Sequence, residues 1–447
     1  MKTSCPYCGN NPVPHRFYRY SENLNIFLTP LRQKLLYNPL SRFFKGGTRP
    51  GKIANLFLDL GLFLGAVSLM RDVKLCKVRR AQVLWEEAQK RGIEMGELLI
   101  FGKPVDIYVA EKKYPLTIIH NPLPSKIKDK RLRIVFSGLP RPVGYVNKWL
   151  DLMDDKWLFK KAMLQNGLPA PMGASCSSFS QACKIFNRIQ KSPFAEASDF
   201  APPSPRLWRA GEATSDKSGD LRPVIVKPRA GSRGRHSTTF VSTEADLKKA
   251  FKIAKQLCYW VIVEEQLFGP VYRATVIGGP STSLGTSKLA GVLRGDPPFV
   301  TGDGLHSIAD LISAKNSQPH PGVKDIAADK ACEVFLSRQN LTLSSVLEKG
   351  MTVNLTEKIG VNYGGSSSED YEICHQDNKE LFLRAARVLG DPVVGFDYII
   401  PDITKSYKEQ RTGFIEVNSL PFINLHHDPL LGTPRNAAAL VWDMLGM

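Results

Sequence analysis

The chain has 447 residues, 43% of them hydrophobic and 23% charged, which is the composition of an ordinary globular protein with about two or three domains. Its formal net charge is +18, and the first 150 residues hold 26 Lys and Arg against 10 Asp and Glu. The other 297 residues hold 34 against 32, so the basic excess lies almost entirely in the first third. Such a region indicates an anionic partner, namely nucleic acid, a membrane surface or an acidic substrate, with a solvated basic face as the alternative.

Residues 1–50 are rich in Arg, Pro and aromatic residues, which predicts an extended or loosely helical arm. The arm contains Cys5 and Cys8 in "CPYCGN", half of a zinc-binding pattern, with His15 nearby and Cys76 as a remote further candidate. A structural zinc and a pair of free thiols both remain open. The other cysteines are scattered without a disulfide pattern, and "MKTSCPYCGNN" has no apolar signal sequence. We therefore expect a cytoplasmic protein, with a peripheral position on a membrane as the alternative.

The most apolar segment is "ANLFLDLGLFLGAVSLM", residues 54–70. Its 17 residues fall short of the ~20 that span a membrane. Its basic flanks would suit an interfacial helix, but we favour a buried or partner-packed helix. Residues 1–75 are together expected to form a basic accessory arm.

Residues 76–150 predict a small α/β domain. "AQVLWEEAQKRG" has helical periodicity, and "GELLIFG", "VDIYVA" and "RLRIVFSGLP" are typical of strands. A second helix is expected in "VNKWLDLMDDKWLFKKAMLQNG", ending at Gly167. We expect this domain to pack on the body that follows, 151–447.

Within that body, residues 192–222 contain much Pro, Ser, Ala and Gly without apolar periodicity, which predicts a mobile insertion. Strands are then predicted at "PVIVKP", "STTFV", "WVIVEEQL", "VYRATVIGG", "LAGVLRG", "VVGFDYIIP" and "GFIEVNS", and helices at "HSIADLISAK", "KELFLRAARVLG" and "PRNAAALVWDML". The fold class is therefore α/β with separate α+β lobes.

Two stretches of the body carry chemistry. In "VIVKPRAGSRGRHS", Lys227 ends a strand before a loop with Gly231 and Gly234, where backbone N–H groups and a fixed cation can approach a polyphosphate. In "GFIEVNS", Glu416 and Asn418 are two apart and leave the same face of a strand. Their oxygens would suit Mg²⁺, or they simply decorate the solvent face of an edge strand.

The order of these motifs resembles the ATP-grasp superfamily, in particular the ATP-grasp part of cyanophycin synthetases and their glutathione-synthetase-like relatives. The resemblance covers roughly residues 145–447 and rests most specifically on "PPFVTGDGLHSIADLI", "VNYGGSSSEDY" and "LHHDPLLGTPRNAA". It implies an ATP-grasp fold preceded by the small α/β domain and the basic arm.

The resemblance also implies roles for individual residues. Lys156 and Lys227 would bind phosphates beneath a lid at 231–235, and Glu264 to Leu267, including Glu265, would face the adenine. Metal ions, Mg²⁺ or alternatively Mn²⁺, would be held by Asp397, Glu416 and Asn418. Arg273 and Arg294 would steady the transferred phosphate or acyl phosphate, and Asn362 with Gly364 and Gly365 would shape the acceptor pocket. His426 and His427 would either contact an anionic substrate or be satisfied by backbone groups.

Three positions depart from the family pattern: Val271 stands where an acidic residue is usual, Thr356 where an arginine is common, and Phe422 where glycine is usual. These departures concern the acceptor substrate more than ATP. The 447 residues also contain no counterpart of the Mur-ligase-like half of cyanophycin synthetase, so we do not expect that bifunctional enzyme.

The function that the resemblance implies is an ATP-dependent carboxylate–amine ligase, which forms an amide bond on an amino acid or peptide through an acyl phosphate. The alternatives are an ATP-grasp phosphotransferase and a nucleotide-binding module that docks through its basic N-terminus. The expected partners are ATP, a carboxylate and an amine. An anionic surface for the basic arm and a homo-oligomer remain open.

Overall fold

The computed structural model describes the chain except for residues 1–4, 6, 9–12, 33–51, 115–129, 137, 143–154, 192–221, 232–233, 281, 319, 321, 338 and 357. The mobile insertion expected at 192–222 lies outside the described residues apart from Arg222. The first half of the helix expected before Gly167 lies outside them as well.

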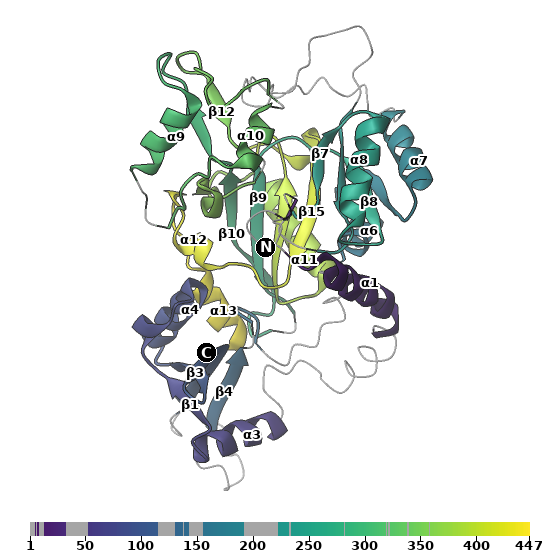
Figure 1. Cartoon of the computed structure of the whole chain (residues 1–447). Helices are drawn as coiled ribbons and strands as arrows, with labels where there is room; N and C mark the ends of the chain where they lie inside the picture. The colour runs from purple at the N-terminus through teal and green to yellow at the C-terminus, as the bar shows by residue number, and fades with distance from the viewer. Residues whose placement is uncertain are drawn as a thin grey trace.

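The small N-terminal lobe is a four-stranded antiparallel sheet, at the lower end of the molecule in Figure 1. Its strands are β1 (Val67–Met70), β2 (Glu94–Ile100), β3 (Lys103–Tyr114) and β4 (Lys130–Phe136), in that order. Helix α4 (Arg79–Lys90) packs against β2, and the short helix η2 (Val73–Leu75) precedes it. The sheet therefore begins at β1, before the boundary expected near Cys76.

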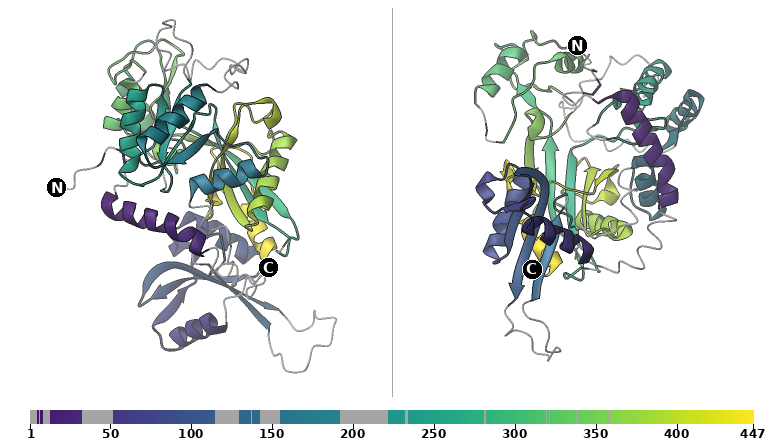
Figure 2. Two further views of the ribbon diagram at one scale, coloured as in Figure 1. Left: turned by 90° about the vertical axis from the view of Figure 1, so that its right-hand side faces the viewer. Right: turned by 60° about the horizontal axis from the view of Figure 1, so that its bottom comes forward.

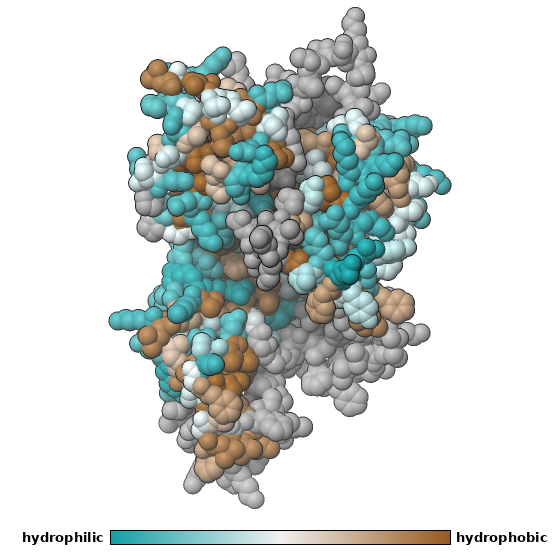
Figure 3. Space-filling view, viewed as in Figure 1, coloured by the Kyte–Doolittle hydropathy of each residue, from teal (hydrophilic) through white to brown (hydrophobic). Residues whose placement is uncertain are grey.

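The apolar segment 54–70 is not one helix. Helix α3 (Lys52–Phe63) ends before Gly65, which has a φ of +70°, and the chain then enters strand β1. Figure 3 shows hydrophobic residues gathered at this lower end of the molecule, and the exposed large apolar side chains described in this segment include Leu56, Leu60, Phe63 and Leu64. These side chains are thus not buried within the chain, and packing against a partner, the other form of the expected helix, stays a prediction. None of the helices that the structure describes is long and apolar enough to cross a membrane.

A second four-stranded sheet forms the lobe at the right of Figure 1. Its strands, in spatial order, are β5 (Gly173–Cys176), β8 (Val261–Glu265), β6 (Val224–Pro228) and β7 (Thr238–Val241). Helices α7 (Phe179–Gln190) and α8 (Glu244–Lys255) pack on it around a core of aliphatic and aromatic side chains. Alternating burial along β6 matches the apolar alternation of "VIVKP".

The largest sheet has six strands and forms the centre of the molecule. Their spatial order is β15 (Gly413–Asn418), β14 (Val393–Ile399), β9 (Val271–Gly278), β10 (Ser287–Asp296), β13 (Ser366–Glu369) and β16 (Leu431–Gly432). Helices α6 (Lys156–Gln165) and α11 (Gln376–Leu389) share its core, in which Phe159, Phe382 and Phe414 are buried. Strand β15 lies at the edge, as the alternative interpretation of "GFIEVNS" supposed.

The remaining elements form a small insertion between β10 and β13 and a C-terminal segment. The insertion contains β11 (Phe299–Thr301), α9 (Ile308–Asn316), α10 (Lys330–Ser337), β12 (Thr352–Asn354) and η5 (Val361–Tyr363). The chain then forms η6 (Tyr407–Glu409) before β15, and ends in α12 (Asn424–His427) and α13 (Ala437–Leu445).

The C-terminal helix joins the small lobe to the body. Trp442 of α13 is fully buried and its Nε1–H donates to the carbonyl of Leu84 in α4, at 2.9 Å. Strand residues of the central sheet, among them Ile277 and Val393, belong to the same core cluster. Burying an aromatic side chain of this size contributes about 2–3 kcal/mol. The small lobe therefore shares a core with the body.

Helix α1 (His15–Arg32) lies against the lobe of β5–β8, far from the small lobe that follows it in sequence (Figures 1 and 2). Ile26 of α1 forms a small buried cluster with Ala230 and Cys258. The side chain of Asn23 accepts a hydrogen bond from the backbone N–H of Tyr259 at 2.8 Å. Helix α1 is thus in contact with the loop that follows β6 and with the segment between α8 and β8.

Candidate functional site

Glu264 sits at the centre of a buried group of charges on β8. Its carboxylate contacts Lys160 of α6 and Lys227 of β6, the latter at 2.6 Å. Burial tends to raise the pKa of Glu264, but the two ammonium groups outweigh it and hold the pKa below its ordinary value. Glu264 is therefore a carboxylate that fixes the position of Lys227, rather than a side chain free to meet a base.

The start of α6 is fastened to the loop after β6. Asp155 caps the helix by accepting from the N–H groups of Trp157 and Leu158, and it also accepts a forked pair of bonds from Arg229 at 2.6–3.0 Å. The neighbouring Lys156 is held beside the same loop, where its Nζ donates to the carbonyl of Gly231. Two lysines from different elements, Lys156 and Lys227, thereby flank one loop.

The loop itself has backbone conformations that favour glycine. Gly231 has a φ of +116° and Gly234 a φ of +62°. A Cβ on Gly231 would lie 3.4 Å from the hydroxyl of Tyr18 of α1. The expected lid is therefore in contact with the N-terminal arm through the residues that the structure describes there.

The predicted adenine segment, Glu264 to Leu267, spans the end of β8 and the residues after it. Glu265 is 5% exposed, and its carboxylate accepts from the backbone N–H of Met172 and pairs with Arg411. Leu267 is also buried, at 6% exposure. The side chain of Glu265 is thus engaged with protein groups, and it joins β8 to the segment that precedes β15.

The predicted metal ligands lie together. Asp397 of β14 is paired across the sheet with Glu416 of β15, and Asn418 donates to Asp397 at 3.3 Å. Arg273 of β9, the partner of Asp397 on its other side, forms a forked ion pair with it, including a bond of 3.0 Å from Nη2. Burial and the nearby charge of Glu416 raise the pKa of Asp397, while Arg273 opposes them.

The lysines predicted to bind phosphate and the carboxylates predicted to bind metal meet at one ion pair. Lys156 Nζ lies 3.3 Å from a carboxylate oxygen of Glu416, whose side chain is 31% exposed. Because Lys156 also reaches the carbonyl of Gly231, one ammonium group joins the glycine loop to the acidic strand pair. This contact brings five of the predicted site residues into one region: Lys156, Gly231, Asp397, Glu416 and Asn418.

Two further predicted site residues lie on other elements: Arg294 on β10 and Asn362 in η5. Arg294 is bonded to Asp296 at 2.8 Å, and the backbone oxygen of Asp296 accepts from Gly360 at 3.0 Å. A Cβ on Gly365 would be 2.1 Å from that same oxygen, which explains the glycine. The loop that carries the exposed Asn362 is therefore held beside the strand of Arg294.

The two adjacent histidines are structural. His426 is fully buried, with its Nδ1 2.6 Å from Glu369 and its Nε2 2.7 Å from the hydroxyl of Thr275. The Nε2 of His427 accepts from the N–H of Ala438 in α13, and burial lowers its pKa to about 4. Contact with an anionic substrate, one of the two interpretations, is wrong for His426.

Sequence reasoning missed three residues that hold this site: Asp155, Lys160 and Arg229. Lys160 had a usable signal, since it follows Lys156 by four residues and so lies on the same face of α6. Asp155 could have been found as an acidic residue just before a helix. Arg229 had no signal beyond its place in a basic loop.

No protein-family model matches this chain. The cyanophycin synthetases of Crocosphaera subtropica and Synechocystis sp. are 32% and 33% identical to it over 231 and 242 residues. These matches cover 50% and 52% of this chain, but only 26% and 27% of those proteins.

A second group of relatives carries the name glutathione biosynthesis bifunctional protein GshAB. The protein of Mannheimia succiniciproducens is 34% identical over 235 residues, which is 50% of this chain and 30% of that protein. Among solved structures, a bifunctional glutathione synthetase from Pasteurella multocida aligns over 82% of this chain and 43% of its own, with 23% identity and a TM-score of 0.49.

The order of strands, lysines and acidic residues, together with these relatives, places the chain in the ATP-grasp superfamily. Within it, the matched proteins are cyanophycin synthetases and GshAB proteins. The chain spans about a quarter to a third of the length of these curated relatives.

Proposed function

We propose that the chain is an ATP-dependent carboxylate–amine ligase that joins an amino acid or peptide to an amine through an acyl phosphate. The observation that carries the proposal is the contact of Lys156 with both Glu416 and the carbonyl of Gly231. It unites a cationic glycine loop with an oxygen-rich strand pair. The names of the matched ligases support the same reaction class.

The phosphate side is built from fixed cations. Glu264 and Asp155 hold Lys227 and Arg229 in place, so these two cations need little reorganisation when a polyphosphate binds. An anion entering here would replace the contacts of Lys156 with Glu416 and Gly231. The backbone of Glu265 to Leu267 would receive the adenine, while the side chain of Glu265 stays paired with Arg411.

The residues opposite fit a hard cation. Asp397, Glu416 and Asn418 offer only oxygen donors from one strand pair, and oxygen ligands are those that Mg²⁺ prefers. They would hold Mg²⁺, or Mn²⁺ in its place, and a bound ion there would neutralise charge on the β- and γ-phosphates. Arg273 keeps Asp397 oriented through its forked ion pair.

The reaction then needs two steps. An oxygen of the substrate carboxylate attacks the γ-phosphorus and ADP leaves, and the amine next attacks the acyl carbon and releases phosphate. The guanidinium groups of Arg273 and Arg294 would steady the anionic acyl phosphate, and the loop of Asn362 would orient the acceptor. Proximity and exclusion of water serve this chemistry better than a nucleophile on the protein.

The test is a screen of amino-acid and dipeptide pairs for Mg²⁺-dependent ADP release, with the product identified by its mass. For a pair that reacts, a carboxylate labelled with ¹⁸O should pass one labelled oxygen to inorganic phosphate, because that oxygen bridges carbon and phosphorus in the acyl phosphate. The Glu416→Gln variant is the negative control, since it should not release ADP with the same pair.

Two results would overturn the proposal. A stable phosphorylated product with no amide would show a phosphotransferase. ATP binding without ADP release for any pair, together with salt-sensitive binding to an anionic surface, would show a nucleotide-binding module.

A further inference from the structure

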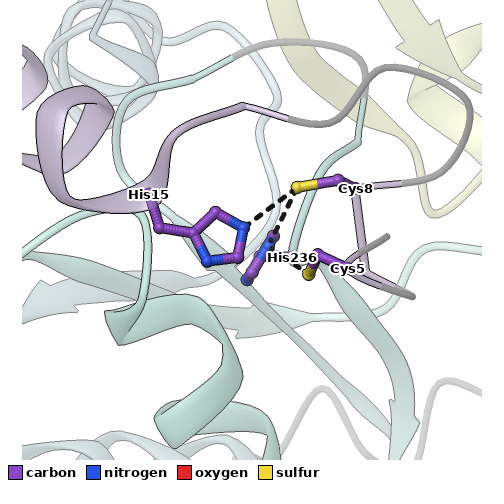
Figure 4. A group of neighbouring side chains, drawn as sticks. All are labelled: Cys5, Cys8, His15 and His236. Atoms are coloured by element: carbon purple, nitrogen blue, oxygen red, sulfur yellow. Dashed lines mark hydrogen bonds between the residues drawn. The ribbon is translucent and has the colours of Figure 1, made fainter. Parts of the chain in front are cut away.

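Four metal-binding side chains meet where the N-terminal arm touches the glycine loop. Cys5, Cys8 and His15 come from the arm, and His236 comes from the segment between β6 and β7 (Figure 4). One ligand atom from each residue lies within 4.8 Å of all the others. The cluster is separate from the acidic strand pair, and residues more than 220 positions apart in sequence create it.

The distances fit a tetrahedral ion. Cys8 Sγ lies 3.2 Å from His15 Nε2 and 3.4 Å from His236 Nε2, and Cys5 Sγ lies 3.5 Å from His236 Nε2. A tetrahedral zinc with Zn–S of about 2.3 Å and Zn–N of about 2.0–2.1 Å would separate sulfur and nitrogen by roughly 3.5 Å. Both imidazoles point the same nitrogen, Nε2, at the thiols.

The surroundings of His236 prepare it as a ligand. Its Nδ1 lies 2.9 Å from the carbonyl oxygen of Ile253, which can only accept a hydrogen bond. The proton therefore sits on Nδ1, and Nε2 keeps a lone pair aimed at the cluster. His236 is 1% exposed, its φ is +54°, and its backbone N–H donates to the carbonyl of Tyr7 at 3.1 Å.

A pair of free thiols explains this arrangement less well. Cys8, 5% exposed, has two imidazole nitrogens near one sulfur; as a thiol it can donate its S–H to one of them, and its sulfur is only a weak acceptor for an N–H of the other. A cation satisfies both thiolates and both imidazoles at once. Cys76, the remote candidate from sequence, lies elsewhere, in the core of the small lobe and 3.9 Å from the hydroxyl of Tyr108.

We propose that Cys5, Cys8, His15 and His236 form a structural Cys₂His₂ zinc site that fastens the N-terminal arm to the glycine loop. Four protein ligands leave no open position, so the ion would stabilise rather than catalyse. Fastened in this way, α1 presents Tyr18 to Gly231 and Ile26 to Ala230. The proposal does not depend on the chain being a ligase.

The decisive measurement is made on the full-length protein, expressed without a polyhistidine tag in medium containing zinc. Metal analysis should find about one zinc per chain. X-ray absorption at the zinc edge should give two sulfur ligands near 2.3 Å and two nitrogen ligands near 2.0–2.1 Å. No zinc after reconstitution, or a shell of a different composition, would overturn the site without any mutation.

Variants then assign the ligands. Cys5→Ser, Cys8→Ser and His236→Ala should each lose most of the bound zinc. Cys183→Ser, a free cysteine of α7 outside the cluster, and His306→Gln, an exposed histidine, should keep it. Zinc retained in all three cluster variants would contradict the assignment.

Chelation tests the fastening. Hydrogen exchange of the α1 amides should accelerate by at least about tenfold when zinc is removed, while the amides of β9 keep their rate. If the protein hydrolyses ATP, the KM for ATP should rise by about three- to tenfold with kcat within about twofold, because loop position and not chemistry is affected. Equal exchange of α1 with and without zinc would show that the ion does not hold the arm.

Discussion

Two acidic centres lie close together in the molecule and differ in what surrounds them. Glu264 on β8 is 1% exposed and is enclosed by Lys160 and Lys227. Glu416 on β15 keeps 31% of its side chain exposed and shares Lys156 with a backbone carbonyl. The first carboxylate is fully used inside the protein, and the second still reaches the solvent.

The difference separates two uses of the same residue type. A buried carboxylate between two lysines cannot give its oxygens to a ligand without leaving charges unpaired, so it positions cations. A half-exposed carboxylate beside Asp397 and Asn418 can exchange a protein cation for a metal ion. The resemblance to ATP-grasp proteins predicts that Glu264 faces the adenine, and in the structure its side chain contacts the two lysines.

The largest effect should follow from breaking the buried centre. Glu264→Ala leaves Lys160 uncompensated in the interior, which typically costs about 3–5 kcal/mol of unfolding free energy. Glu416→Ala, at the exposed centre, should cost less than about 1 kcal/mol. Urea unfolding of both variants measures the contrast. Equal losses would mean that the two centres do not differ in this way.

The buried centre can also be repaired. Combining Glu264→Gln with Lys160→Met removes the carboxylate together with the lysine it neutralises. This double variant should recover part of the stability that Glu264→Gln alone loses, because the most deeply buried ammonium group, that of Lys160, is gone and only Lys227 lacks its partner. A double variant no more stable than the single one would point to packing instead of charge.

The exposed centre should show the opposite pattern, with lost turnover and retained stability. If the chain is a ligase, Glu416→Gln should lower ADP-forming turnover by at least about 100-fold, because a neutral amide replaces a charged metal ligand. The melting temperature should stay within about 2 °C. Glu409→Gln, an exposed neighbour in η6, is the control and should retain activity. A fully active Glu416→Gln protein would remove Glu416 from the metal site.

A smaller effect is expected for His427, through the pH dependence of stability. Burial lowers the pKa of His427 to about 4 from 6.5, so the unfolded chain takes up its proton first as the pH falls. The stability that His427 contributes is complete above pH 6.5 and declines between pH 6.5 and 4, by up to about 3 kcal/mol. His427→Gln should flatten that decline in urea unfolding. An unchanged acid profile would assign the decline to other groups.

Much of the fold could be predicted because its strands alternate strongly. "VIVEE", "VVGFDYI" and "GFIEVN" became β8, β14 and β15, and "RRAQVLWEEAQK" became α4. The apolar run 54–70 was expected to be a single helix, because its composition suits a helix and a strand equally. Only Gly65 marks the place where the helix ends and the chain turns into a strand. The segment of helix α1 was expected only as part of an extended or loosely helical arm, since its apolar stripe is weak and its contacts are remote in sequence.

The site was predictable where its residues share an element or adjoining strands. Glu416 and Asn418 are two apart on β15; the strand register pairs Glu416 with Asp397, and the Asn418 side chain donates a hydrogen bond to Asp397. His236 could not be matched to Cys5 and Cys8 from sequence, because 228 or more residues separate them and spacing carries no information over that distance. The pairing of Glu264 with Lys160 likewise depends on how α6 packs against β8.

The smallest expected effect follows from deleting the N-terminal arm, which differs from the rest of the chain in its charge. Residues 1–50 hold eight Lys and Arg against one Asp or Glu. Deleting them should weaken binding to anionic vesicles and flatten its dependence on salt, because fewer counterions are released. Turnover of a small soluble substrate should survive, with a moderately higher KM for ATP, since Tyr18 and Ile26 no longer support the loop. A truncated protein that folds yet fails to bind ATP would place the arm within the active site and end its interpretation as an accessory element.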